Sequence, residues 1–169
     1  MKKLVTILGT QHELQGCERR AGNLDDPLYL PLLKRLLAED KLDFIFEEAT
    51  GLGPTIAQNL SLTELGANRY LDVDPSRENR EKFGIPANTN DPIMIGSPVT
   101  MAAFYDTVFH EVHAKRELFW IQEMKNQQFD RALIIVGQNH TLSFAFRLLA
   151  ENFVVKTFTY EPSQYAVKV

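Results

Sequence analysis

Short apolar runs recur along the chain, and most of them end in a glycine or an acidic residue. Five such runs are Leu4–Leu8, Asp43–Phe46, Tyr70–Val73, Ala132–Val136 and Phe153–Phe158. They are apolar almost throughout and do not alternate with polar residues, which is typical of strands covered on both faces, as in a parallel sheet. The run at Tyr70–Val73 carries the weakest pattern, so we predict four or five strands.

Segments with helical periodicity lie between these runs. They are Pro31–Glu39, Pro54–Leu60, Ser76–Phe83, Val99–Met124 and a helix that begins near Thr141. Thr141 can cap this last helix, whose predicted buried side carries Leu142, Ala145, Phe146, Leu148 and Leu149. The alternation predicts an α/β fold: an open, mostly parallel sheet of four or five strands, with helices on both faces and right-handed crossovers. At 169 residues the chain suits a single domain, residues 1–169.

Two of the predicted strands are followed by the same short motif. His12 lies three residues after Gly9, and His140 lies three residues after Gly137. Glycine allows a sharp turn after a strand, and ligands of open α/β sheets bind beyond the carboxyl ends of the strands. We therefore expect the two imidazoles to meet in one site. The alternative for each histidine is a capping or loop role.

Glu47 and Glu48 follow a third predicted strand and supply carboxylates at the same level. Because side chains alternate along a strand, only one of the two should face the site. Glu47 continues the strand directly, which favours it slightly. The alternative is that one carboxylate serves a helix start and the other is solvated.

The predicted helix Val99–Met124 carries an apolar face, and Arg116 lies near its centre. An unpaired buried charge is very costly, so Arg116 should either bind a ligand or form an ion pair with a carboxylate such as Glu47 or Glu48. His113 falls on the flank of this face and His110 on the far side. Their spacing of three differs from the spacing of four in the zinc-protease helix, so His113 is only a supporting candidate.

Composition narrows the function classes. A net charge of −4 and a pI of about 5.6 argue against an extended nucleic-acid surface. The single cysteine, Cys17, excludes an internal disulfide and a cysteine-based zinc site, and a Cys–His nucleophile has no other support. The sequence carries no signal-peptide pattern and no apolar stretch that would span a membrane, so we expect a cytoplasmic protein without a membrane partner.

Two further segments have open interpretations. Asp72 and Asp74 are either additional carboxylates at the sheet edge or turn and cap residues. Residues 86–98 combine proline, asparagine and glycine, which is compatible with a lid or binding loop and equally with an irregular surface segment.

Taken together, Gly9-Thr10-Gln11-His12, Glu47, Arg116 and Gly137-Gln138-Asn139-His140 resemble the motifs of the erythromycin esterase/ChaN-like and TraB/PrgY/Tiki superfamily. The resemblance spans residues 9–140 and implies an α/β fold in which two Gly-x-x-His motifs, a glutamate and an arginine gather at one pocket. Some members look like metal-dependent proteases, some are esterases thought to use histidine as a base, and ChaN-like members bind haem. The chain is shorter than most members, so no substrate carries over.

These residues lead us to expect a hydrolase acting on an ester, amide or phosphoester of a small molecule or peptide. In a metal-dependent form, His12, Glu47 and His140 would hold Mn, Zn, Co or Fe, with Glu48 as general base and Arg116 at the oxyanion. In a metal-free form, one histidine activates water and a glutamate orients its imidazole. The alternatives are a non-catalytic module that binds a small anionic ligand such as a nucleotide, or a purely structural cluster. A homo-oligomer is compatible with either function.

Overall fold

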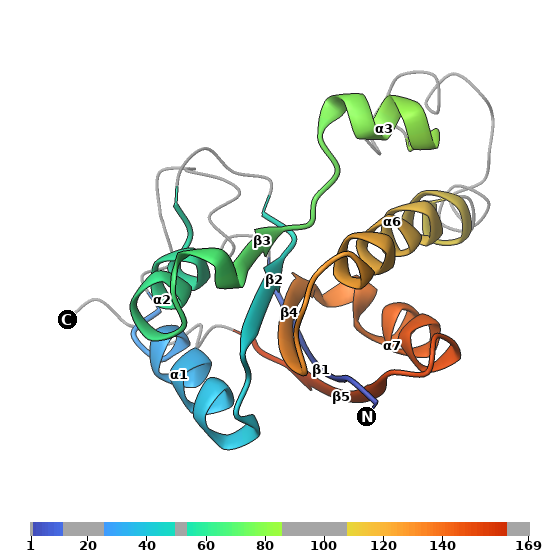
Figure 1. Cartoon of the computed structure of the whole chain (residues 1–169). Helices are drawn as coiled ribbons and strands as arrows, with labels where there is room; N and C mark the ends of the chain where they lie inside the picture. Colours follow the sequence, from blue (N-terminus) through green and yellow to red (C-terminus); the bar gives the residue numbers. More distant parts are fainter. Residues whose placement is uncertain (1, 12–25, 50–53, 86–107, 162–169) are drawn as a thin grey trace. The chain divides into compact units, whose positions relative to one another are not determined.

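All five predicted strands form, and they join in one parallel sheet. The computed structural model describes residues 2–11, 26–49, 54–85 and 108–161. Within these residues the strands are β1 (Leu4–Thr10), β2 (Phe44–Glu47), β3 (Tyr70–Asp72), β4 (Arg131–Gly137) and β5 (Val154–Thr159). Their order is β3-β2-β4-β1-β5, and every neighbouring pair is parallel (Figure 1). The predicted open α/β fold is confirmed.

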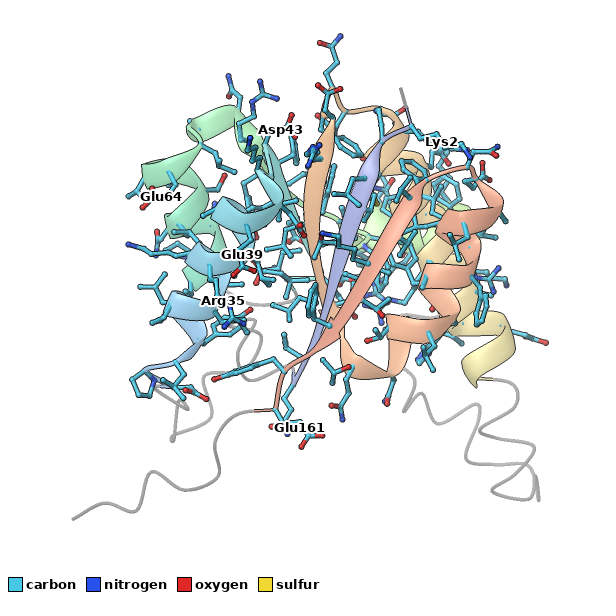
Figure 2. The ribbon with its side chains drawn as sticks, turned by 90° about the horizontal axis from the view of Figure 1, so that it is seen from below. Lys2, Arg35, Glu39, Asp43, Glu64 and Glu161 are labelled. Atoms are coloured by element: carbon cyan, nitrogen blue, oxygen red, sulfur yellow. The ribbon has the colours of Figure 1, made fainter. Side chains whose placement is uncertain are left out.

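Helices cover both faces of this sheet, as predicted. Helices α1 (Tyr29–Asp40) and α2 (Ile56–Glu64) lie on one face, and α7 (Thr141–Ala150) lies on the other (Figures 1 and 2). The face under α1 and α2 buries a cluster of aliphatic side chains from both layers, including Leu8, Leu33, Ile45, Leu60 and Leu133. Two short 3₁₀ turns, η2 (Ala67–Arg69) and η4 (Gln138–His140), precede β3 and α7.

The chain divides into two compact units: residues 1–73 with 128–169, and residues 74–127. The first unit holds the sheet. In the second, the described elements are α3 (Arg77–Phe83), the π-helix η3 (Val108–His113) and α6 (Ala114–Lys125). Phe83 packs edge-on against Phe119, with ring centroids 5.2 Å apart. The π turn adds a residue to the helical repeat, and the buried face of α6 beyond it includes Trp120, Ile121 and Met124.

The strand order places a reversal of direction between β1 and β4. The chain passes from β1 through α1 to β2 on one side, and from β4 through α7 to β5 on the other. Because β1 and β4 are neighbours, their carboxyl ends flank the switch point where open α/β sheets bind ligands. Thr10 of β1 pairs with Gly137 of β4 in the parallel register. Both Gly-x-x-His motifs therefore begin at this point.

The predicted buried side of the last helix is correct for Ala145 and Leu148 and wrong for three other residues. In α7 the buried residues are Thr141, Phe144, Ala145 and Leu148. Leu142, Phe146 and Leu149, which we predicted to be buried, are 69%, 71% and 52% exposed. Apolar residues occupy more than half of the circumference of this helix, so the pattern alone does not fix which side meets the sheet.

A close approach between α7 and β1 sets the orientation instead. A Cβ added at Gly9 would lie 2.1 Å from Thr141 Oγ1 and 3.2 Å from the Cα of Gln138, so only glycine fits there. Thr141 is the first residue of α7 and not its cap: His140 occupies the N-cap position without a side-chain cap bond. Thr141 Oγ1 is buried without a hydrogen-bond partner among the described residues.

None of the helices in the described ranges is long and apolar enough to cross a membrane.

Candidate functional site

The second Gly-x-x-His motif forms a tight link between β4 and α7. Strand β4 ends at Gly137, the turn η4 covers Gln138–His140, and α7 begins at the next residue. His140 is almost fully buried, with 2% of its surface exposed. The motif thus holds one imidazole beneath the surface at the switch point, at the N-terminal end of a ten-residue helix.

Glu48 is the carboxylate that faces this histidine. Its backbone N–H donates to Ile135 O of β4 at 2.9 Å, which extends the β2–β4 pairing by one residue. Its side chain is fully buried, and Oε2 accepts a hydrogen bond from the Gly137 N–H at 2.8 Å. Oε1 lies 4.0 Å from His140 Nε2, which is within ion-pair distance but longer than a hydrogen bond. The Gly137 bond fixes the carboxylate beside the imidazole.

Glu47 points to the opposite face of the sheet, as the alternation along β2 requires. Its Oε2 accepts hydrogen bonds from Thr55 Oγ1 at 2.5 Å and from the Tyr70 hydroxyl at 2.8 Å. Its Oε1 is buried and has no hydrogen-bond partner among the described residues. The sequence pattern slightly favours Glu47 for the site with His140, whereas in the structure Glu48 lies beside this histidine.

Burial controls the protonation of Glu47. The side chain is fully buried. Loss of hydration raises the pKa of the Glu47 carboxyl to about 7, against the opposing effect of the hydrogen bonds from Thr55 and Tyr70, and the nearby charge of Asp72 raises it further. The same burial raises the pKa of the Tyr70 hydroxyl. Glu47 is thus a carboxyl that exchanges its proton near neutral pH.

The sequence did not single out Thr55 or Tyr70. Thr55 is the N-cap of α2 and accepts from the Gln58 N–H at 3.0 Å, so its hydroxyl both starts the helix and donates to Glu47. A threonine placed before an apolar helical run is a recognisable cap signal. Tyr70 is the first residue of β3 and pairs with Ile45. Its contact with Glu47 follows from this register, which the sequence pattern alone does not give.

Arg116 belongs to the second unit and forms an ion pair there. Its Nη2 lies 2.6 Å from Asp74 Oδ1, and Arg80 Nη2 contacts both oxygens of the same carboxylate at 3.1 and 2.8 Å. The guanidinium also lies over the Trp120 ring, 5.3 Å from its centroid. The ion-pair alternative for Arg116 is realised with Asp74, a carboxylate that we did not name as its partner. Asp72, at the end of β3, accepts from the Ala49 N–H at 3.1 Å and so links the ends of the neighbouring strands β2 and β3.

Several predicted positions lie outside the described residues. They are His12, Cys17, the segment 86–98, and the side chain of His110. His113 is described and is buried in the second unit. Within the described ranges, His, Cys, Asp and Glu side chains form no group of three or more that would hold a metal ion. Of the predicted metal ligands, Glu47 lies with Thr55 and Tyr70, whereas His140 lies with Glu48, so the structure does not bring Glu47 and His140 together. His12 lies outside the described ranges, so its part in a metal site stays a prediction.

A pocket of about 470 Å³ lies on the face covered by α1. It is lined by Leu8, Leu28, Pro31, Leu32, Arg35, Phe158, Thr159 and Tyr160. Neither Glu48 nor His140 is among these residues. We therefore identify the candidate site by the buried Glu48 and His140 side chains at the switch point, and not by the volume of this pocket.

No protein-family model and no curated protein sequence matches this chain. The resemblance to the superfamily named above rests on the motifs alone.

Proposed function

We propose that the chain is a hydrolase in which His140 removes a proton from water and Glu48 positions the imidazole. The observation that carries the proposal is the buried Glu48–His140 pair, with Oε1 and Nε2 4.0 Å apart at the switch point of the sheet. A histidine beside a buried carboxylate is a recurring general-base arrangement. The resemblance to a superfamily that includes histidine-dependent esterases supports the same reaction.

The roles of the two residues follow from their contacts. The Gly137 N–H holds Glu48 Oε2, and Glu48 Oε1 lies on the side of His140 Nε2, so Oε1 accepts from Nε2–H when the pair tightens. The Nδ1 atom is then the nitrogen that accepts a proton from water, while the hydroxide attacks the carbonyl carbon or phosphorus of the substrate. The imidazolium returns its proton to the leaving group, and the charge of Glu48 stabilises it in between.

Helix α7 adds an electrostatic contribution. Its N-terminus lies at the same edge and has no side-chain cap bond. The aligned peptide dipoles give this end a partial positive charge, which favours the negative charge that develops on the substrate oxygen.

The alternative, a non-catalytic module for a small anionic ligand, has weaker support. Glu48 already accepts from the Gly137 N–H, the first donor of the turn that leads into α7. A buried carboxylate at this position stabilises a histidine that becomes cationic during turnover, which the binding of an anion alone does not require.

The test is turnover of a panel of carboxylic esters, peptides and phosphodiesters by the full chain. His140→Ala should lower kcat by on the order of 10²–10⁴-fold. Glu48→Gln should lower kcat with little change in KM, because its amide oxygen still accepts from Gly137 N–H but carries no charge. Glu39→Gln, at an exposed surface ion pair with Arg35, is the matched carboxylate control and should behave as the wild type. Full turnover by His140→Ala would refute the proposal.

A further inference from the structure

Three large apolar side chains lie in a line on the outer surface of α7. They are Leu142, Phe146 and Leu149, spaced by four and three residues and each more than half exposed. We call them the α7 stripe. Single exposed apolar residues are common on protein surfaces, but an aligned set at helical spacing marks an interaction surface. The charged residues of α7, Arg147 and Glu151 at its C-cap, fall on the other flank of the helix.

The direction of the α7 stripe follows from helix geometry. At about 100° per residue, the stripe is centred about 115° from the middle of the buried face. Helix α7 runs antiparallel to the strands and connects β4 to β5, and such crossovers are right-handed. This handedness turns the stripe toward the side of the sheet where β5 is the outermost strand. The stripe and the free edge of β5 therefore form one continuous surface.

The outer edge of β5 pairs with none of the described strands. Among the strands that the structure describes, β5 has a neighbour on one side only, namely β1. The N–H groups of Val154 and Tyr160 donate to Lys3 O and Gly9 O, so those of the alternate residues, such as Thr157, point away from the sheet. The strand contains no proline, and its one lysine, Lys156, is held by Asp40. Natural edge strands usually carry such devices against pairing, and β5 has few of them.

We propose that a second copy of this chain docks on this surface, with the two β5 strands antiparallel and the two α7 stripes in contact. A strand edge is complementary to itself under a twofold axis perpendicular to the sheet, because donors and acceptors alternate along it. The same axis places both α7 helices on one face. The inference concerns an interface remote from His140 and does not rest on the proposed reaction.

The spacing of the two helices is consistent with this arrangement. Helix α7 packs on both β5 and β1, and paired strands lie about 4.8 Å apart. An axis midway between the two β5 strands then separates the α7 axes by on the order of 10 Å, close to the 8–10 Å of packed helices. The stripe and the six-residue edge would bury roughly 600–800 Å² per copy, which approaches a standard stable interface.

The molar mass of the full chain in solution, measured by sedimentation equilibrium over a wide concentration range, tests the proposal. We expect twice the chain mass of 19.3 kDa. Leu149→Glu should give monomers, and Leu62→Glu on α2 is the matched control, because the two leucines are 52% and 51% exposed. Thr157→Pro removes an outward N–H and leaves the bonds to β1 in place, so it should also give monomers.

Circular dichroism of each variant establishes that the fold is retained. A wild-type chain that stays monomeric at every concentration overturns the proposal, as does an assembly larger than a dimer. A dimer that persists in both Leu149→Glu and Thr157→Pro also overturns it. Dissociation by Leu149→Glu alone would overturn the pairing of the β5 edges, and dissociation by Leu62→Glu would place the interface on the α2 face.

Discussion

Replacing Glu47 by glutamine should remove a pH-dependent loss of stability. The carboxyl is fully buried, its two donors are Thr55 and Tyr70, and its Oε1 has no partner among the described residues. A glutamine has the same shape as the protonated acid, and its amide oxygen can accept both hydrogen bonds. The variant therefore differs from the wild type mainly in having no proton to lose.

The magnitude follows from the shift in pKa. The Glu47 carboxyl titrates near 4.5 when solvated and at about 7 in the folded chain. Because the folded-state pKa is raised, the stabilising effect of the bound proton is complete below the unfolded pKa and is lost as the pH rises through the folded pKa. At about 1.4 kcal/mol per unit of pKa, the full difference is about 3–4 kcal/mol.

The assay is chemical denaturation of the wild type and Glu47→Gln at intervals from pH 5 to pH 8, followed by circular dichroism and tryptophan fluorescence. The stability of the variant relative to the wild type should increase by about 2–3 kcal/mol over this range. Contributions of the histidines are common to both proteins and cancel in the difference. Glu39→Gln, at an exposed carboxylate, should give a difference that does not vary with pH. If the difference in unfolding free energy between Glu47→Gln and the wild type also did not vary with pH, the reasoning would be refuted.

Three further predictions test other features. Gly9→Ala should cost about 1–3 kcal/mol of unfolding free energy, because its Cβ would meet Thr141 Oγ1, and adding Thr141→Ala should restore part of this; unchanged stability in denaturant would contradict the close packing. Asp40→Asn should destabilise the chain near neutral pH but not in strong acid. Burial raises the pKa of the Asp40 carboxyl, but the hydrogen bond and the charge of Lys156 outweigh this effect, and the pKa is lowered overall. The stabilising contribution of the carboxylate is therefore present above the unfolded pKa and is lost as the pH falls through the folded pKa. A loss that is equal at low and neutral pH in denaturation curves would argue against this. Finally, EDTA should leave hydrolysis intact if His140 activates water unaided; loss that added Mn, Zn, Co or Fe reverses would support the metal-dependent form.

Most of the strands were predictable because their patterns are clear, with Tyr70–Val73 as the exception. Runs such as Ala132–Val136 are too short for a buried helix and too uniformly apolar for an edge, so a central parallel strand is the interpretation that fits. The strand order was not predictable, since β4 enters between β2 and β1 and nothing in its composition names its neighbours. The orientation of α7 failed for a related reason: its apolar residues surround most of the helix, and packing against Gly9 decided the outcome.

The candidate site was predictable as a set of positions but not as a set of contacts. Alternation along β2 indicated that Glu47 and Glu48 face opposite sides, but the choice between them depends on where the strand begins and ends. The helical phase of Arg116 predicted that its side chain faces inward. The phase did not predict its partner, Asp74, which lies 42 residues earlier in the chain. Long-range pairs of this kind are set by topology, which a single sequence does not encode locally.

The position of β4 in the sheet also bears on how the chain assembles. This central strand pairs with β1 at Leu4↔Arg131 and with β2 at Phe44↔Ala132, so among the described strands β1 and β2 are joined through a segment that is synthesised after both. Until then β1 and β2 carry apolar faces and unpaired edges. Non-local pairing of this kind slows folding and exposes aggregation-prone strands. The nascent chain should therefore depend on chaperones during synthesis, and truncation before residue 131 should yield insoluble protein.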